Sequence, residues 1–182
     1  MPVAYNLKFI QRKRLRDGSD HISTYIYKFK SDVTGYFYIV NAERYTGDVF
    51  ALKFYCKKDR KSVYKYNKVI NKGDVKNILF TCAGVLQIIL SNYNAASFFL
   101  ACSGRYDPRS ESIEPHQANK RFKVYDLLAN EWIGKKTFQH FIYEQISCHL
   151  WVNRNNADVD VKEREIVAML RRTYIDFPYY GL

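Results

Sequence analysis

Apolar residues recur at helical spacing along residues 74–92 and predict a helix there. Asp74 suits the start of this helix, because a short carboxylate side chain accepts hydrogen bonds from the free N–H groups of a first turn. We expect the helix to pack into the core. The residues of its buried face, three or four positions apart, are Val75, Ile78, Leu79, Cys82, Val85, Leu86, Ile89 and Leu90.

Two further helices are predicted in the second half of the chain. Residues 119–133 carry one apolar face. The third helix starts at Asp158 or Asp160 and places Arg171 and Arg172 in its last turn, where the helix dipole favours cations. The apolar face of residues 119–133 consists of Phe122, Tyr125, Leu128, Ala129, Trp132 and Ile133.

Other apolar runs predict strands. Residues 25–30, 36–40 and 49–56 are joined by short segments that suit antiparallel hairpins. Residues 97–102 are typical of a buried strand, and residues 138–152 alternate in polarity as one long strand. The expected inward-facing residues of this last strand are Ile146, Cys148 and Leu150.

The fold class that these elements favour is α+β, with a mostly antiparallel sheet of five or six strands packed by about three helices. A chain of 182 residues has room for one domain, which we place at residues 1–182. Within it, residues 1–20 form a basic N-terminal arm, either mobile or the first strand of a hairpin, and residues 178–182 form a short tail.

The cysteines and the absence of targeting signals indicate a cytoplasmic protein. Each cysteine lies in an apolar run, and none forms a CxxC pair, so we expect buried free thiols. The N-terminus lacks the apolar core of a signal peptide, and no segment is apolar enough for a membrane span. The four cysteines are Cys56, Cys82, Cys102 and Cys148.

The net charge is the strongest indication of the kind of partner. The chain has 29 Lys and Arg against 18 Asp and Glu, a formal net charge of +11, which favours an anionic partner, either nucleic acid or an acidic protein. The densest basic segment also contains Tyr64 and Tyr66, which could stack on bases. The alternative is a solvated loop or edge strand. The residues of this basic patch are Lys57, Lys58, Arg60, Lys61, Lys65 and Lys68.

A second set of cations predicts an anion site at the start of the helix at residues 119–133. Lysine and arginine crowd a terminus where the helix dipole is already positive, and this arrangement is unfavourable unless an anion offsets it. That anion is a bound phosphate or carboxylate, or else Asp107, Glu111 or Glu114 of the chain itself; a solvated face is the other alternative. The predicted anion site consists of Arg105, Arg109, Lys120, Arg121 and Lys123.

No catalytic signature stands out, so we expect a binding protein with no catalytic residues, metal or cofactor. A metal-dependent nuclease can be written from loop residues at ordinary spacing. An uncovered edge strand and the aromatic tail would also suit a homodimer. The residues of the nuclease alternative are Asp107, Glu111, Glu114, His116 and Lys120.

The element order resembles that of two groups of proteins. One comprises short uncharacterised bacterial proteins of unknown function, in which a strand meander precedes helix, strand, helix and strand; this resemblance implies no activity. It covers residues 25–177 and is carried by Gly73, Asp74, Ala101, Cys102, Ser103, Gly104, Asp107, Gln117, Arg121, Lys123, Tyr125 and Trp132.

The second resemblance is to the GNAT acyltransferases, in which three antiparallel strands lead to a cofactor-binding helix, a strand, and a helix with a tyrosine general acid. Residues 124–128 are similar to that second helix, which implies coenzyme A as cofactor and Tyr125 as the acid. The glycine-rich phosphate turn of that family is reduced to Gly73, and Asp74 follows it. A GNAT-like acyltransferase with a degenerate coenzyme A site is therefore the alternative function.

Overall fold

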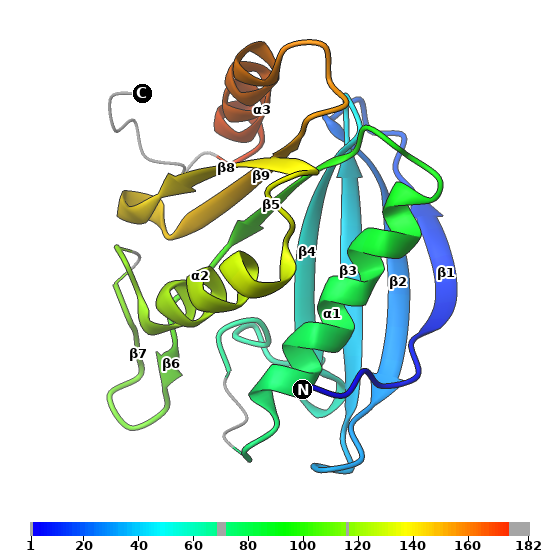
Figure 1. The fold of residues 1–182 in the computed structure, drawn as a ribbon. Coiled ribbons are helices and arrows are strands. Elements are labelled where there is room, and N and C mark those ends of the chain that lie inside the picture. Colours follow the sequence, from blue (N-terminus) through cyan, green and yellow to red (C-terminus); the bar gives the residue numbers. More distant parts are fainter. Residues whose placement is uncertain (1, 69–71, 116, 175–182) are drawn as a thin grey trace.

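One mixed sheet organises the chain. The structure, a computed structural model, describes residues 2–68, 72–115 and 117–174. Within these residues the sheet has seven strands in the order β1-β2-β3-β4-β5-β9-β8, and β6 pairs with β7 in a separate hairpin (Figure 1). The strands are β1 (Lys8–Arg14), β2 (His21–Lys30), β3 (Phe37–Tyr45), β4 (Val49–Cys56), β5 (Ser97–Ala101), β6 (Tyr106–Asp107), β7 (Ser112–Ile113), β8 (Phe138–Tyr143) and β9 (Cys148–Asn153).

The α+β class is confirmed, but the predicted sheet of five or six mostly antiparallel strands is not exact. Of the two alternatives for the basic N-terminal arm, Lys8 to Arg14 form the hairpin strand, β1, which pairs antiparallel with β2. The ladder between β4 and β5 is parallel, because α1 carries the chain back to the same end of the sheet.

The single long strand predicted at residues 138–152 is wrong. The structure shows a hairpin in which Tyr143 of β8 pairs with Cys148 of β9 around a one-turn 3-10 helix, η2 (Glu144–Ile146). Ser147 closes the turn with a φ of 48°, in the left-handed region. Glycine, proline, asparagine and aspartate are all missing from this turn, so the alternation of polarity ran on without a visible break. Ile146 lies in the turn, whereas Cys148 and Leu150 are buried as expected.

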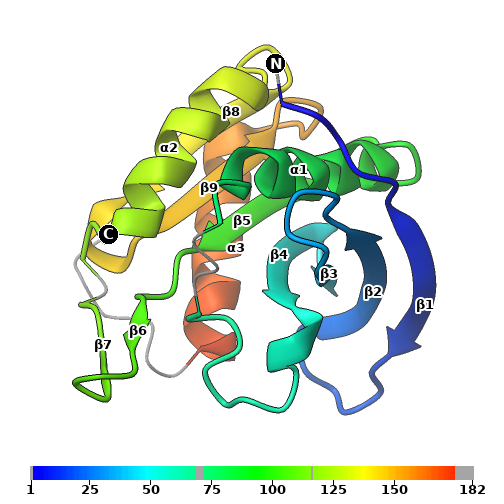
Figure 2. The same cartoon turned by 90° about the horizontal axis from the view of Figure 1, so that it is seen from below.

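Helices cover both faces of the sheet. Figures 1 and 2 show α1 (Val75–Leu90) and α2 (Lys120–Trp132) on one face and α3 (Val159–Thr173) on the other. α2 begins where Asn119 accepts a hydrogen bond from the Phe122 amide, at 2.9 Å. α3 begins at Asp158, which caps the amides of residues 160 and 161.

Alternation along the strands divides the core into two layers. Phe50 and Phe98 face α1 and α2, whereas Ala51 and Phe99 face α3. Because both faces are apolar, β4 and β5 read as continuous hydrophobic runs, as expected for strands covered on both sides.

The predicted core face of α1 is largely confirmed. Val75 is the exception, because it lies at the first turn and is 44% exposed. Thr81, which the apolar pattern excluded, is buried, and its hydroxyl accepts a hydrogen bond from the Tyr5 amide at 2.9 Å. The four cysteines are buried and free, as predicted, and burial raises the pKa of the Cys148 thiol to about 12.

A buried carboxylate ties the start of α1 to the N-terminal segment and to the end of β2. Asp74 is 2% exposed, and it accepts hydrogen bonds from the Tyr5 hydroxyl at 2.7 Å, from Ser31 Oγ, and from Asn77 Nδ2 at 2.8 Å. Asp74 occupies the N-cap position, but its side chain makes no cap hydrogen bond. The carboxylate is instead held by these three donors.

Replacing Asp74 tests how much this cluster contributes. We expect Asp74→Ala to lower the free energy of unfolding by about 3 kcal/mol, because it leaves buried donors without their charged acceptor. Tyr5→Phe should cost about 1 kcal/mol, because it removes one donor. Urea unfolding followed by circular dichroism measures both, with the exposed neighbour Asp32→Ala as control. Equal effects of Asp74→Ala and Asp32→Ala would show that the cluster adds nothing.

Candidate functional site

The parallel ladder between β4 and β5 is short, and a cavity lies where it ends. The two strands pair only at Val49 with Ser97, Phe50 with Phe98, and Ala51 with Phe99. β4 continues for five residues beyond this ladder and β5 for two. β5 stays paired with β9 on its other edge as far as Ala101, whereas its pairing with β4 ends at Phe99. The sheet is therefore open between residues 52–56 and residues 100–103.

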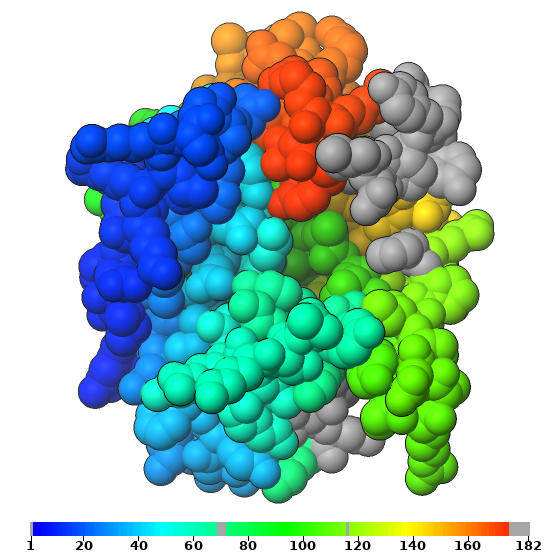
Figure 3. Space-filling model, turned by 180° about the vertical axis from the view of Figure 1, so that it is seen from behind, coloured from blue at the N-terminus to red at the C-terminus, as the bar shows by residue number. Residues whose placement is uncertain are grey.

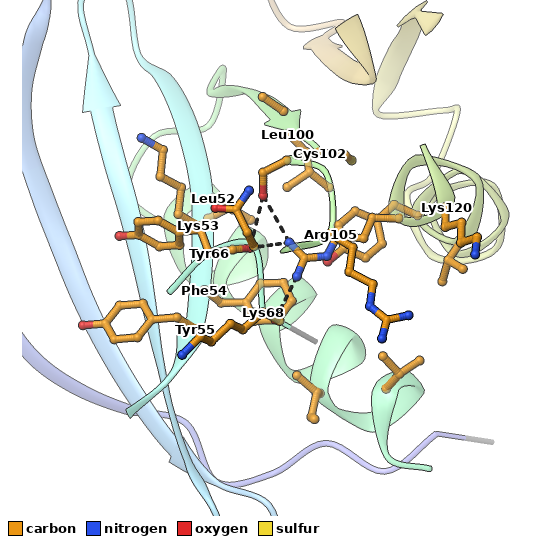
Figure 4. A pocket seen from close by; sticks show the side chains of 18 of the residues that line it. Leu52, Lys53, Phe54, Tyr55, Tyr66, Lys68, Leu100, Cys102, Arg105 and Lys120 are labelled. Carbon is orange, nitrogen blue, oxygen red and sulfur yellow. Dashed lines mark hydrogen bonds between the residues drawn. The ribbon is translucent and has the colours of Figure 1, made fainter. Parts of the chain in front are cut away.

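The central cavity fills this opening, with a volume of about 460 Å³. Its lining includes the consecutive residues 52–56 and 100–103. Successive side chains of a strand point to opposite faces, so a cavity that touches every residue in turn follows the backbone edge of the strand. Figure 4 shows this alternation: Lys53 and Tyr55 point to one side of β4, and Leu52 and Phe54 to the other.

Apolar side chains of the opened strands stay partly exposed. Leu52, Phe54 and Leu100 are only half-buried, although they belong to strands inside the sheet. Burial of this surface would be favourable by about 25 cal/mol for each Å². These walls therefore favour a ligand with an apolar part.

A strap closes the outer end of the opening. We use this name for residues 66–68, which cross from the segment after β4 to the segment after β5. Asn67 Nδ2 donates to the Gly104 carbonyl at 2.9 Å, and the Tyr106 amide donates to the Asn67 carbonyl at 3.1 Å. Tyr64 and Tyr106 stack with ring centroids 4.1 Å apart. Figure 3 shows the segment after β4 lying beside the β6–β7 hairpin on this side of the molecule.

Arg121 of α2 holds the strap from inside. Its guanidinium donates to the Tyr66 carbonyl, to Ser103 Oγ at 3.1 Å and to the Lys68 carbonyl at 2.8 Å. These bonds join α2, the strap and the end of β5, and they appear as dashed lines in Figure 4. Arg121, part of the predicted anion site, therefore donates three hydrogen bonds to other groups of the protein.

The start of α2 already has a carboxylate beside it. Glu114 accepts hydrogen bonds from the Lys120 amide at 3.1 Å and from the Arg105 amide at 3.3 Å. A negative charge at this terminus offsets the helix dipole. For the backbone amides at this terminus, the chain therefore supplies its own anion, Glu114, which was one of the alternatives predicted from the sequence.

The other predicted anion-site residues divide into two groups. Arg105 and Lys120 line the central cavity together with Arg121 and lie across it from Phe54 and Tyr55 (Figure 4). Arg109 and Lys123 are exposed and outside this lining. With Lys53 and Lys68, five cations line the described part of the cavity against one carboxylate, Glu114.

Several ions of this lining have partners. Lys53 forms an ion pair with Glu43 at 2.7 Å, and Lys68 forms one with Asp59 at 3.1 Å. Ion pairs as exposed as that of Lys68 contribute little to stability. Among the described residues, Arg105 and Lys120 are exposed cations of the lining outside these two ion pairs, so they are best placed to meet a ligand's negative charge.

Lysines of the basic patch lie over tyrosine rings, so these ring faces are covered by the protein itself. Lys58 lies over the ring of Tyr36 at 4.4 Å, and Lys65 lies over Tyr55 at 4.9 Å and Tyr66 at 5.1 Å. Tyr66 also packs edge-on against Tyr55. Tyr64 and Tyr66, predicted to stack on bases, are thus engaged within the protein. The patch residues Lys57, Arg60 and Lys61 are exposed.

Tyr125 and Cys102 bring chemically useful groups to the lining. Burial raises the pKa of the Tyr125 hydroxyl far above its usual range, whereas the nearby charge of Arg121 lowers it, and the protonated hydroxyl can donate a hydrogen bond. Burial also raises the pKa of the Cys102 thiol, which therefore lacks the thiolate form that a nucleophile needs.

The residues of the nuclease alternative do not assemble into a metal site where they are described. No group of three or more His, Cys, Asp or Glu side chains suited to a metal occurs in residues 2–68, 72–115 and 117–174. Glu114 is bound to backbone amides, and Asp107 accepts from the Arg109 amide at 2.9 Å. His116 lies outside the described residues, as does the predicted tail at residues 178–182.

The strand edges at residues 52–56 and 100–103 were missed by sequence reasoning. These edges would contact a ligand through backbone N–H and C=O groups. Every residue carries such groups, so the identity of the side chains does not reveal the edges. A partial signal was available in the lengths of the two strands, because β4 has eight residues and β5 has five.

Comparisons with known proteins give no independent guide. No protein family, curated protein or solved structure matches the chain. Among the described helices, none combines the length and hydrophobicity that crossing a membrane requires. Both resemblances therefore stay predictions, and the function has to be argued from the central cavity.

Replacing Arg121 tests its role in holding the strap. We expect Arg121→Gln to lower the free energy of unfolding by about 2 kcal/mol, because it leaves polar groups of the strap without their charged partner. Amide hydrogen exchange at Tyr106, whose N–H bonds the strap, should become faster. Lys123→Gln, on the exposed side of the same helix, is the control. Unchanged exchange at Tyr106 in Arg121→Gln would contradict this role.

Proposed function

We propose that the central cavity binds an acyl thioester of the coenzyme A type and that the protein transfers its acyl group to an acceptor. The observation that carries this proposal is the opening between β4 and β5, a cavity bounded by two strand edges. This is the alternative function named from the sequence, and the gap in the sheet favours it because an anion-binding surface needs no such gap; the non-catalytic binding protein stays a second proposal.

An extended ligand with amide groups suits such an opening. Strand edges present N–H and C=O groups that need partners, and an added strand or an extended amide chain supplies them. The pantetheine arm of coenzyme A is extended and contains two amides. It could therefore lie between residues 52–56 and 100–103 as a short strand would.

Charge at the cavity suits the phosphates of the same ligand. Arg105 and Lys120 are exposed at the lining, and a guanidinium matches phosphate geometry. Val75 also lines the cavity, so the first turn of α1 borders it. The Asp74 carboxylate beside this turn is held by Tyr5, Ser31 and Asn77, and it makes no cap hydrogen bond to the amides of the turn.

We assign the role of proton donor to Tyr125, which lines the central cavity. In the transfer step, an amine or hydroxyl acceptor attacks the thioester carbonyl carbon, the carbon–sulfur bond breaks, and the leaving thiolate takes the proton of Tyr125. The proton that the acceptor loses returns to Tyr125 through solvent. This is the role that the GNAT resemblance implies for the same residue.

Nucleic acid remains the second candidate for the basic patch. The specific observation that favours it is the exposure of Lys57, Arg60 and Lys61 on one short segment. Since the tyrosines of this segment pack on other side chains, such binding would be electrostatic and would weaken steeply with salt.

Thermal unfolding tests coenzyme A binding. A ligand that binds only the folded state at 100 times its Kd raises the free energy of unfolding by about 2.7 kcal/mol, and we expect coenzyme A to raise the melting temperature accordingly. Lys120→Gln should reduce this shift, whereas Lys61→Gln, outside the lining, should not. A short nucleic acid tested across a salt series is the competing ligand. Stabilisation that comes from nucleic acid alone would reject the coenzyme A site.

Activity tests the role of Tyr125. Release of free thiol from acetyl coenzyme A, measured with a panel of amine acceptors, should fall by about 100-fold or more in Tyr125→Phe. Coenzyme A binding should persist in this variant, because the ring remains. Tyr64→Phe, which alters a tyrosine outside the lining, is the matched control. Equal rates for the two variants would remove Tyr125 from the chemistry.

A further inference from the structure

A second, smaller hollow lies beside the central cavity, between α1 and α2. Its volume is about 70 Å³. We call it the side hollow. Besides four residues that it shares with the central cavity, its lining consists of Val40, Leu79, Cys82, Ala83, Leu86, Leu128, Ala129, Trp132, Ile133 and Trp151.

The side hollow and the central cavity adjoin one another. Leu52 and Phe54 of β4, Leu100 of β5 and Tyr125 of α2 line both. A ligand group that extends beyond the Tyr125 side chain therefore has the side hollow next to it. In the proposed reaction, the group bonded to the thioester carbonyl lies beside Tyr125, because this residue protonates the sulfur.

The lining of the side hollow is almost entirely hydrocarbon. The polar side-chain atoms among its lining residues are the Tyr125 hydroxyl, the Cys82 thiol and the indole nitrogens of Trp132 and Trp151. Burial raises the pKa of the Cys82 thiol, so it carries no charge here. A polar group would lose its water without gaining partners, whereas a hydrocarbon chain loses nothing on entering.

Small side chains keep the side hollow open. Ala83 of α1 and Ala129 of α2 both line it. Protein interiors are normally close-packed, and larger apolar residues at these two positions would extend into the space. The sequence thus places alanines where leucines would fill the hollow.

We propose that the transferred acyl group is a hydrocarbon chain longer than acetyl, which passes Tyr125 and lies in the side hollow between α1 and α2. This inference rests on the proposed coenzyme A function, and it names the substrate class of the same site.

The test is a series of coenzyme A thioethers that cannot be hydrolysed, with chains of two, four, six and eight carbons. Isothermal titration calorimetry should show affinity rising by roughly fourfold for each added methylene until the side hollow is full. Free coenzyme A sets the baseline, and free octanoate tests whether the hollow binds a fatty acid without its carrier. We expect octanoate alone to bind far more weakly than the eight-carbon thioether.

A variant tests whether the acyl chain lies in the side hollow. Ala83→Leu should abolish the dependence on chain length while the affinity for free coenzyme A stays within about twofold, because the substituted side chain lines the side hollow but not the central cavity. Ala168→Leu, the same substitution on the exposed side of α3, should leave the dependence unchanged.

The outcomes separate this inference from the proposed function. Coenzyme A binding with the same affinity for every chain length would overturn the inference and leave the function standing. If neither coenzyme A nor any thioether binds, the proposed function fails. Octanoate that binds as tightly as the eight-carbon thioether would show a fatty-acid site and would also overturn the inference. The series needs only the wild-type protein, so misfolding of Ala83→Leu cannot mask the result.

Discussion

Three residue pairs hold the two parts of the sheet together. The parallel ladder joins Val49, Phe50 and Ala51 to residues 97–99, and every other neighbouring pair in the sheet is antiparallel. An antiparallel pair can be closed by a tight turn, but this parallel junction needs the crossover helix α1. The same junction leaves β4 and β5 free to separate once its three pairs end. Both the central cavity and the side hollow depend on that separation.

An opening in a sheet is costly unless its surroundings are fixed. Backbone groups at the two edges lose their strand partners, and apolar residues such as Leu52 and Phe54 stay half-exposed. The protein offsets part of this cost locally. The strap at residues 66–68 bonds to the segment after β5, and Arg121 ties both to α2. Strong interactions thus surround the cavity without filling it, as expected where a ligand supplies the missing contacts.

Local signals in the sequence identified much of this fold, and long-range pairing escaped them. The helix at residues 119–133 and the buried face of α1 followed from apolar spacing, and the start of α3 was predicted at Asp158 or Asp160. The hairpin around Ser147 was not predicted, because its turn contains no residue that favours the left-handed conformation. Strand order and the point at which β4 and β5 part depend on tertiary packing, which no single segment encodes. The sequence marked Lys120 and Arg121 as unusual cations at a helix N-terminus. Arg121, however, binds the strap through the Tyr66 carbonyl.

Net charge alone cannot choose between the two functions considered, because both use cations to hold phosphate. A value of +11 attracts nucleic acid and coenzyme A alike, and the exposed patch residues would serve either. Geometry discriminates better. Base stacking by a polynucleotide needs open ring faces, whereas Tyr64 and Tyr66 pack against other tyrosines, so only electrostatic contacts would hold it. A ligand with an extended amide chain between two charged or apolar ends needs an enclosed passage with a cationic mouth and a hydrocarbon end. Under this proposal, Lys120 and the two strand edges of the central cavity meet the first two needs, and the adjoining alanine-lined side hollow meets the third.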